Sequence, residues 1–95
     1  MANERYSNVF DAFADTPEEA ANLRLRSLLM IRIGDYIESW GLGQKDAAKR
    51  LGITQPRLSE LLKGKIDKFS LDALVNILDA ANLQLDFAVT PKEVA

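Results

Sequence analysis

Residues 44–61, QKDAAKRLGITQPRLSEL, decide the fold of this chain of 95 residues. Within them a small residue stands at Ala48, a glycine at Gly52, and leucines at Leu58 and Leu61. Two short helices that cross at a steep angle need a small residue where they touch and a glycine where the chain reverses between them. They also need apolar residues that wedge the second helix against the first. The stretch therefore predicts two short helices joined by a tight turn.

Capping residues predict where both helices begin and end. The first helix is expected over residues 44–51 and ends at Gly52, since glycine takes the left-handed conformation most cheaply. Thr54 is a good N-cap for the second helix, which is expected over residues 55 to about 63. The core of the helix pair is predicted to consist of Ala48, Leu51, Gly52, Ile53, Leu58 and Leu61.

Two further helices are expected on either side of this pair. The segment Thr16 to Glu19, TPEE, combines an N-cap, a proline at the first helical position and a glutamate three residues after the cap. Apolar residues then recur with helical spacing, which predicts a helix over residues 17–40 with a weak point at Gly34. Ser70 is expected to begin the fourth helix and Asn82 to end it, because asparagine also takes the left-handed conformation.

The last apolar segment alternates instead. From Leu83 to Thr90 apolar and polar residues follow each other with period two before Pro91, which predicts one half-buried strand. A lone strand leaves its amides and carbonyls unpaired and must find a partner edge. The partner is either the same strand of a second copy, across a two-fold axis, or the segment 9–13 of the same chain. The residues predicted for this dimer strand are Leu83, Leu85, Phe87 and Val89.

We therefore expect one small domain, an all-α helical bundle with one short C-terminal β-strand. Residues 1–15 are expected to form an N-terminal arm, residues 16–82 the helical domain, and residues 83–95 the C-terminal dimerisation strand and tail. The N-terminus lacks the regions of a signal peptide, and charged residues break the longest apolar-rich stretch. A cytoplasmic protein without membrane contact is therefore expected.

The composition excludes most enzyme chemistry. The chain contains no histidine and no cysteine, so it offers neither an imidazole base nor a thiolate nucleophile. The ligands that most often hold zinc are missing for the same reason. We expect no enzymatic activity, no metal and no cofactor.

The charge is unevenly distributed along the chain. The whole chain has a net charge of −2, but residues 1–43 carry −3, residues 44–68 carry +4 and residues 69–95 carry −3. The basic island, residues 44–68, coincides with the predicted helix pair and its following loop. A polyanion is therefore its expected partner. The alternative is an ordinary helical bundle on which these lysines and arginines form a solvated face.

The spacing within residues 44–61, followed by the loop Lys63-Gly64-Lys65, resembles the lambda-repressor-like (Cro/CI, or XRE) helix-turn-helix family. The resemblance covers about residues 23–81. It implies that the second helix of the pair enters the major groove of double-stranded DNA. It also implies a homodimer that binds a palindromic operator with half-sites one helical turn apart.

The resemblance implies base contacts at the start of the second helix. Gln55 can pair with adenine, and Arg57 with guanine or a phosphate. Glu60 can accept from cytosine, whereas Pro56, where the family often has a polar residue, offers only apolar contact. Gly43 departs from the usual Thr or Ser and gives a weaker cap. The expected phosphate contacts are Gln44, Lys45, Thr54, Ser59, Lys63 and Lys65; for each lysine the alternative is a solvated side chain.

A second resemblance extends to the flanks. The chain is similar to HigA-like antitoxins in the segments SNVFD (7–11), GL (41–42), QP (55–56), GK (64–65) and FSL (69–71). Proteins of that group bind an mRNA-cleaving toxin and repress the shared operon, which implies a cognate toxin as a further partner. The apolar arm residues Val9, Phe10 and Phe13 either dock on such a toxin or pack on the first long helix.

Two functions therefore remain open. The first is a dimeric, sequence-specific DNA-binding repressor, with or without toxin neutralisation. The second is a helical protein-interaction module that does not bind DNA. A steep fall of DNA affinity with added salt distinguishes them, because several phosphate contacts require it.

Overall fold

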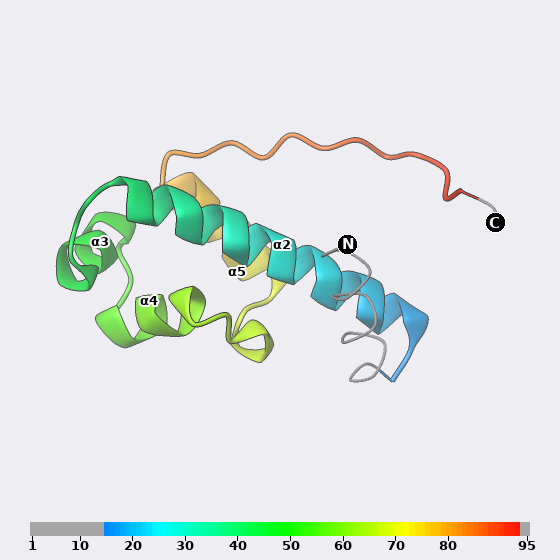
Figure 1. Ribbon diagram of the computed structural model, residues 1–95, viewed down its shortest axis with the longest axis horizontal. Helices are drawn as coiled ribbons and strands as arrows, with labels where there is room; N and C mark the ends of the chain where they lie inside the picture. The colour runs from blue at the N-terminus through cyan, green and yellow to red at the C-terminus, as the bar shows by residue number, and fades with distance from the viewer. Residues whose placement is uncertain (1–14, 94–95) are drawn as a thin grey trace.

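The computed structural model describes residues 15–93, and within them it contains four α-helices and one short 3-10 helix (Figure 1). In chain order these are α2 (Pro17–Ser39), α3 (Gln44–Leu51), α4 (Gln55–Leu62), η1 (Ile66–Lys68) and α5 (Leu71–Ala80). The long helix α2 packs against α4, η1 and α5, while α3 packs against α4 and α5. The predicted helical bundle is confirmed for the described residues, and η1 is an addition that the sequence did not predict.

The first residues of α2 explain where it begins. The Thr16 hydroxyl oxygen accepts a hydrogen bond from the Glu19 amide at 3.1 Å, and a proline occupies the first helical turn. The Glu19 carboxylate accepts from the amide of Asp15 at 3.2 Å, whereas a complete capping box would bond the N-cap residue itself. The helix continues without a break through Gly34, and Gly41 follows it with a φ of 68°. None of the helices within residues 15–93 is long and apolar enough to cross a membrane.

The turn between α3 and α4 depends on Gly52. Its φ of 70° lies in the left-handed region, where a side chain costs roughly 1–2 kcal/mol. In this conformation the amides of residues 52 and 53 each donate at 3.1 Å to carbonyls of the last turn of α3, which satisfies that helix end. Thr54 then caps α4 by accepting from the amide of Arg57 at 3.2 Å. The predicted boundaries of α3 are confirmed, and α4 ends one residue earlier than expected.

The limits of α5 also match the sequence. The Ser70 hydroxyl oxygen accepts from the Ala73 amide at 3.1 Å. At the other end Asn82 has a φ of 59°. Its amide donates to Asp79, and the amide of Leu83 donates to the carbonyl of Leu78 at 2.9 Å. These two bonds close the helix in the same way as the glycine closes α3.

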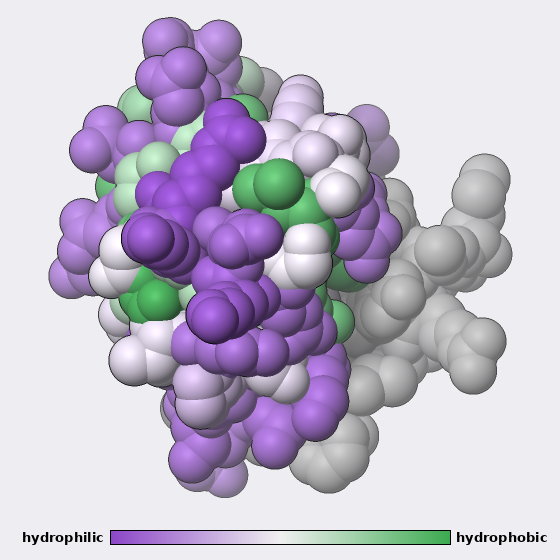
Figure 2. Space-filling model, turned by 90° about the vertical axis from the view of Figure 1, so that its left-hand side faces the viewer, coloured by the Kyte–Doolittle hydropathy of each residue, from purple (hydrophilic) through white to green (hydrophobic). Residues whose placement is uncertain are grey.

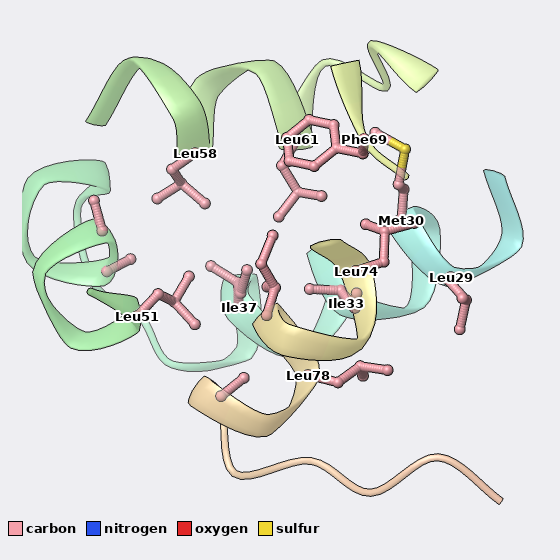
Figure 3. Packing of buried hydrophobic residues seen from close by; sticks show 14 residues of the cluster. Leu29, Met30, Ile33, Ile37, Leu51, Leu58, Leu61, Phe69, Leu74 and Leu78 are labelled. Carbon is pink, nitrogen blue, oxygen red and sulfur yellow. The ribbon is translucent and has the colours of Figure 1, made fainter. Parts of the chain in front are cut away.

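The hydrophobic core lies where all four α-helices meet. Leu58 and Leu61 point inward from α4, toward Ile33 of α2 and Leu74 of α5 (Figure 3). These four side chains and Phe69 are the largest that are almost completely buried. Burial of one such side chain contributes about 1.5–3 kcal/mol to folding. The core therefore fixes α4 on α2 and leaves Gln55 and Pro56, at the start of α4, exposed.

The expectation of a C-terminal β-strand is wrong for this single chain. No strand occurs within residues 15–93, and residues after Leu83 extend from the bundle without regular structure (Figure 1). Leu83 is half-buried against the core, but Leu85 is 45%, Phe87 83% and Val89 88% exposed. A strand forms only when its amides and carbonyls pair with a neighbouring edge, and no part of residues 15–93 supplies one. The alternative partner, segment 9–13, lies outside the described residues.

Candidate nucleic-acid interface

The first turn of α4 lies at the surface. Gln55 and Pro56 are exposed, while Ser59 and Glu60 in the following turn are half-buried. Leu58, between them, is completely buried. The apolar side of α4 thus holds the helix on the bundle, and its first residues face solvent. Polar side chains at such an exposed helix start can reach the edges of bases in the major groove.

Exposed basic side chains lie on both helices of the pair and on the turn after them. They come from α3, from the end of α4 and from the turn that follows it: Lys45, Lys49, Arg50, Lys63, Lys65 and Lys68. The end of the molecule that carries α3 is covered mainly by hydrophilic side chains, with only small separate hydrophobic areas (Figure 2). The basic side chains of the island are therefore exposed along α3, the end of α4 and η1, together with the carboxylates of Asp46 and Asp67.

The residues predicted to contact phosphate differ in their surroundings. Gln44, Lys45 and Lys63 are exposed, as is Lys65, and their side chains are free to reach a phosphate. The Thr54 hydroxyl is exposed but accepts the hydrogen bond that caps α4. At the start of α3 no side chain of residues 15–93 caps the helix, and the first amides of a helix have no partner within it. Those amides can donate hydrogen bonds to a phosphate oxygen.

The core of the helix pair is arranged around these residues. Gly52 is exposed at the turn, Ile53 is half-buried beside it, and the remaining members of the predicted set are buried: Ala48, Leu51, Leu58 and Leu61. Ala48 is only 3% exposed, so a larger side chain at this position would have to displace its neighbours. The steric role expected from its spacing stays a prediction.

Arg57 does not point freely into solvent. Its guanidinium carbon lies 3.8 Å from the centroid of the Phe69 ring. Its Nη1 donates a hydrogen bond of 2.6 Å to the carbonyl oxygen of Lys68. The side chain is half-buried. In the chain without DNA, the candidate base contact at this position is therefore occupied by contacts to η1 and to the residue that follows it.

Arg26 is a half-buried partner of the same turn, and the sequence analysis did not select it. Its Nη1 donates to the carbonyl oxygens of Ile66 at 3.2 Å and Phe69 at 3.1 Å. A signal for it exists in the sequence, because Arg26 occupies the helical face that Met30 and Ile33 bury. A charged residue on an apolar face needs a polar partner inside the protein.

The described part of the chain offers no cluster of acidic side chains that could hold a metal ion. The exposed amides, lysines and arginines of residues 44–68 can donate hydrogen bonds to phosphates and bases.

Two short helices joined at Gly52, with the second one exposed at its start, form a helix-turn-helix. The family model described as helix-turn-helix domain matches residues 12–90, and the chain belongs to that family. Membership indicates a DNA-binding regulator. No curated protein matches the sequence.

Proposed function

We propose that this protein is a sequence-specific transcriptional repressor that binds a palindromic operator as a homodimer. The observation that carries the proposal is the exposed first turn of α4 within the basic island, while the segments before and after that island are acidic. This distribution attracts DNA to one face and repels it from the others. α4 then enters the major groove with Gln55 foremost.

The proposed base contacts divide by chemistry. Gln55 is exposed, and its side-chain amide can donate to adenine N7 and accept from the adenine N6 amino group. Pro56 beside it offers only an apolar surface to a thymine methyl group. Glu60 is half-buried one turn further along α4 and can accept from cytosine N4. Phosphate contacts come from Gln44, Lys45, Thr54, Ser59, Lys63 and Lys65.

Binding of the protein to DNA from its own upstream region tests the proposal. We expect retardation of that DNA. A dimer in which Lys45, Lys63 and Lys65 of both protomers make six phosphate contacts should lose affinity on the order of 10³-fold between 50 and 200 mM salt. Gln55→Ala should relax the preference at one base pair and cost about 1–3 kcal/mol. A dimeric protein that binds none of this DNA at low salt contradicts the repressor and favours a protein-interaction module.

The homodimer is proposed from the C-terminal segment. Leu85, Phe87 and Val89 are exposed apolar side chains, and their backbone pairs with no other segment of residues 15–93. Leu85 also lines a groove of about 350 Å³, together with Leu29 and Tyr36 of α2. Pairing of two such segments across a two-fold axis would supply the missing strand partner and cover these side chains.

Removal of residues 83–95, followed by light scattering, tests the dimer. Because Leu83 contacts the core, a second variant that ends after residue 84 keeps that contact and removes only the exposed apolar residues. We expect both shortened chains to be monomers and the full chain to be a dimer. A shortened chain that remains a dimer contradicts pairing through this segment.

The same protein is proposed as the antitoxin of a toxin–antitoxin operon. The similarity to HigA-like antitoxins supports this role. The arm residues Val9, Phe10 and Phe13, which lie outside the described residues, are the proposed toxin contacts. A small basic toxin encoded in the adjacent open reading frame would support the role, and copurification of that product with the full chain tests it. Loss of copurification on deletion of residues 1–14 is the expected result.

A further inference from the structure

Two arginines from different helices hold the backbone of one turn. Arg26 of α2 donates to the carbonyl oxygens of Ile66 and Phe69, at 3.2 and 3.1 Å. Arg57 of α4 donates to the carbonyl oxygen of Lys68 at 2.6 Å. The turn between them is η1 together with Phe69, whose ring lies 3.8 Å from the Arg57 guanidinium. Three carbonyl oxygens of this turn, those of Ile66, Lys68 and Phe69, thus accept hydrogen bonds from arginine side chains.

The turn has few internal hydrogen bonds of its own. Within it the amide of Lys68 donates to Lys65 at 3.0 Å, and the amide of Phe69 donates to Ile66 at 3.4 Å. A hydrogen bond from a charged donor contributes about 1.5–3 kcal/mol, against roughly 0.5–1.5 kcal/mol for a neutral one. The arginine bonds are therefore the stronger restraints on its position.

The surroundings of Arg26 favour arginine over other side chains. Its Nε is buried and meets no acceptor among residues 15–93, which carries a desolvation cost. The two hydrogen bonds that Nη1 donates offset that cost. Lysine at this position could not place a planar group with several donors between the two carbonyls.

The turn carries the last lysines of the basic island. Lys65 precedes η1 and Lys68 ends it, and both side chains are exposed. Lys63 caps the end of α4 just before them. The position of this turn relative to α4 consequently decides whether its ammonium groups reach phosphates when Gln55 reaches a base.

We propose that Arg26 and Arg57 are positioning residues for DNA binding and that Lys68, with Lys65, is the phosphate contact they position. The proposal rests on the proposed function. Arg57 remains on Phe69 and the Lys68 carbonyl in the complex and does not read a base. Its release toward the groove would leave the Lys68 carbonyl without its charged donor and separate the guanidinium from the aromatic ring.

The two roles of Arg57 predict different results in a selection from randomised DNA. If Arg57 positions the turn, Arg57→Ala weakens binding to every sequence by a similar factor and leaves the preferred bases unchanged. If it reads guanine, the preference is lost at one base pair only. Arg26 lies on α2, away from the start of α4, and Arg26→Gln is expected to give the same uniform loss.

The salt dependence of binding identifies the phosphates. Lys68→Ala and Lys65→Ala should each lower the slope of log affinity against log salt by about 0.9 per protomer, or about 1.8 for the dimer. Lys92→Ala, an exposed lysine outside the basic island, is the matched control and should leave the slope unchanged. Arg26→Gln should lower the slope by up to twice that amount, because both lysines lose their positions.

Combined variants separate positioning from a direct contact. In a chain that already carries Lys65→Ala and Lys68→Ala, Arg26→Gln and Arg57→Ala should have little further effect on affinity. Arg26→Lys and Arg57→Lys keep the charge, and urea unfolding verifies that each variant is folded. Additive losses, or a preference lost at one base pair in Arg57→Ala, overturn the inference. If the wild type binds DNA and Lys68→Ala leaves the slope of log affinity against log salt unchanged, the inference is also overturned. If the wild type does not bind DNA, the proposed function itself is contradicted.

Discussion

The guanidinium carbon of Arg50 lies 4.0 Å from the centroid of the Trp40 ring. Trp40 is the C-cap of α2, and Arg50 stands in the last turn of α3. The contact joins the end of the long helix to the first helix of the helix-turn-helix across the loop of residues 41–43. It thereby limits how α3 can move relative to α2.

Loss of this contact should lower stability by a measurable amount. A cation over an exposed aromatic face contributes about 0.5–1 kcal/mol, and Arg50 also lies near the C-terminus of α3, where a positive charge is favourable. Arg50→Ala should lower the free energy of unfolding by about 1 kcal/mol in urea. The double-mutant cycle with Trp40→Leu isolates the ring contact, and a coupling energy near zero would show that the two side chains act independently.

Gly34 should be replaceable with a gain in stability. An added Cβ at this position would lie 3.6 Å from Cδ2 of Leu62, an ordinary van der Waals distance. Because glycine inside a helix costs about 0.5–1 kcal/mol relative to alanine, Gly34→Ala should raise the free energy of unfolding by that amount. The matched control is Gly52→Ala, where a φ of 70° predicts a loss instead. A decrease in the free energy of unfolding of the Gly34→Ala variant would contradict this prediction.

The cap of α4 should affect both stability and DNA binding. Thr54→Ala removes the acceptor of the Arg57 amide and should cost about 0.5–2 kcal/mol in unfolding free energy. Thr54→Ser keeps that acceptor and serves as the control. Since frayed residues at the start of α4 include Gln55, the alanine variant should also bind DNA more weakly. If Thr54→Ala binds DNA as tightly as the wild type at a temperature where it is fully folded, the cap of α4 does not affect DNA binding.

The exposed apolar residues of the C-terminal segment should affect association and leave the fold intact. Phe87 and Val89 are 83% and 88% exposed, so replacement of both by serine removes little buried surface from the single chain. The expected result is an unchanged unfolding curve at low protein concentration and a lower mass in light scattering. Lys92→Ala, in the same segment, provides the control. A variant with wild-type mass would exclude these two side chains from the dimer contact.

Local signals in the sequence were sufficient for most of the secondary structure. Thr16, Thr54 and Ser70 each cap the helix that follows them, as their side chains predict. Gly41, Gly52 and Asn82 take positive φ angles at the helix ends. These are interactions within one or two turns of chain, so they depend little on the rest of the fold. The basic island was also visible, because charge can be counted along the chain.

The C-terminal strand shows where local pattern was insufficient. Its alternation from Leu83 to Thr90 is a real feature of the sequence, but a strand is a property of two paired edges. The 3-10 helix η1 went unpredicted for a related reason. It is three residues long, and side chains from α2 and α4 hold its backbone.

By itself, the sequence determined the helices, the glycine turn between α3 and α4 and the position of the positive charge, because capping, backbone sterics and charge act over short distances along the chain. Only the tertiary structure decided the surroundings of Arg57 and Arg26. The carbonyls that they bind are 11 and about 40 residues away, and no periodicity in the sequence encodes contacts at that separation. The folding of α2 and α4 onto one core brings both arginines to the same turn.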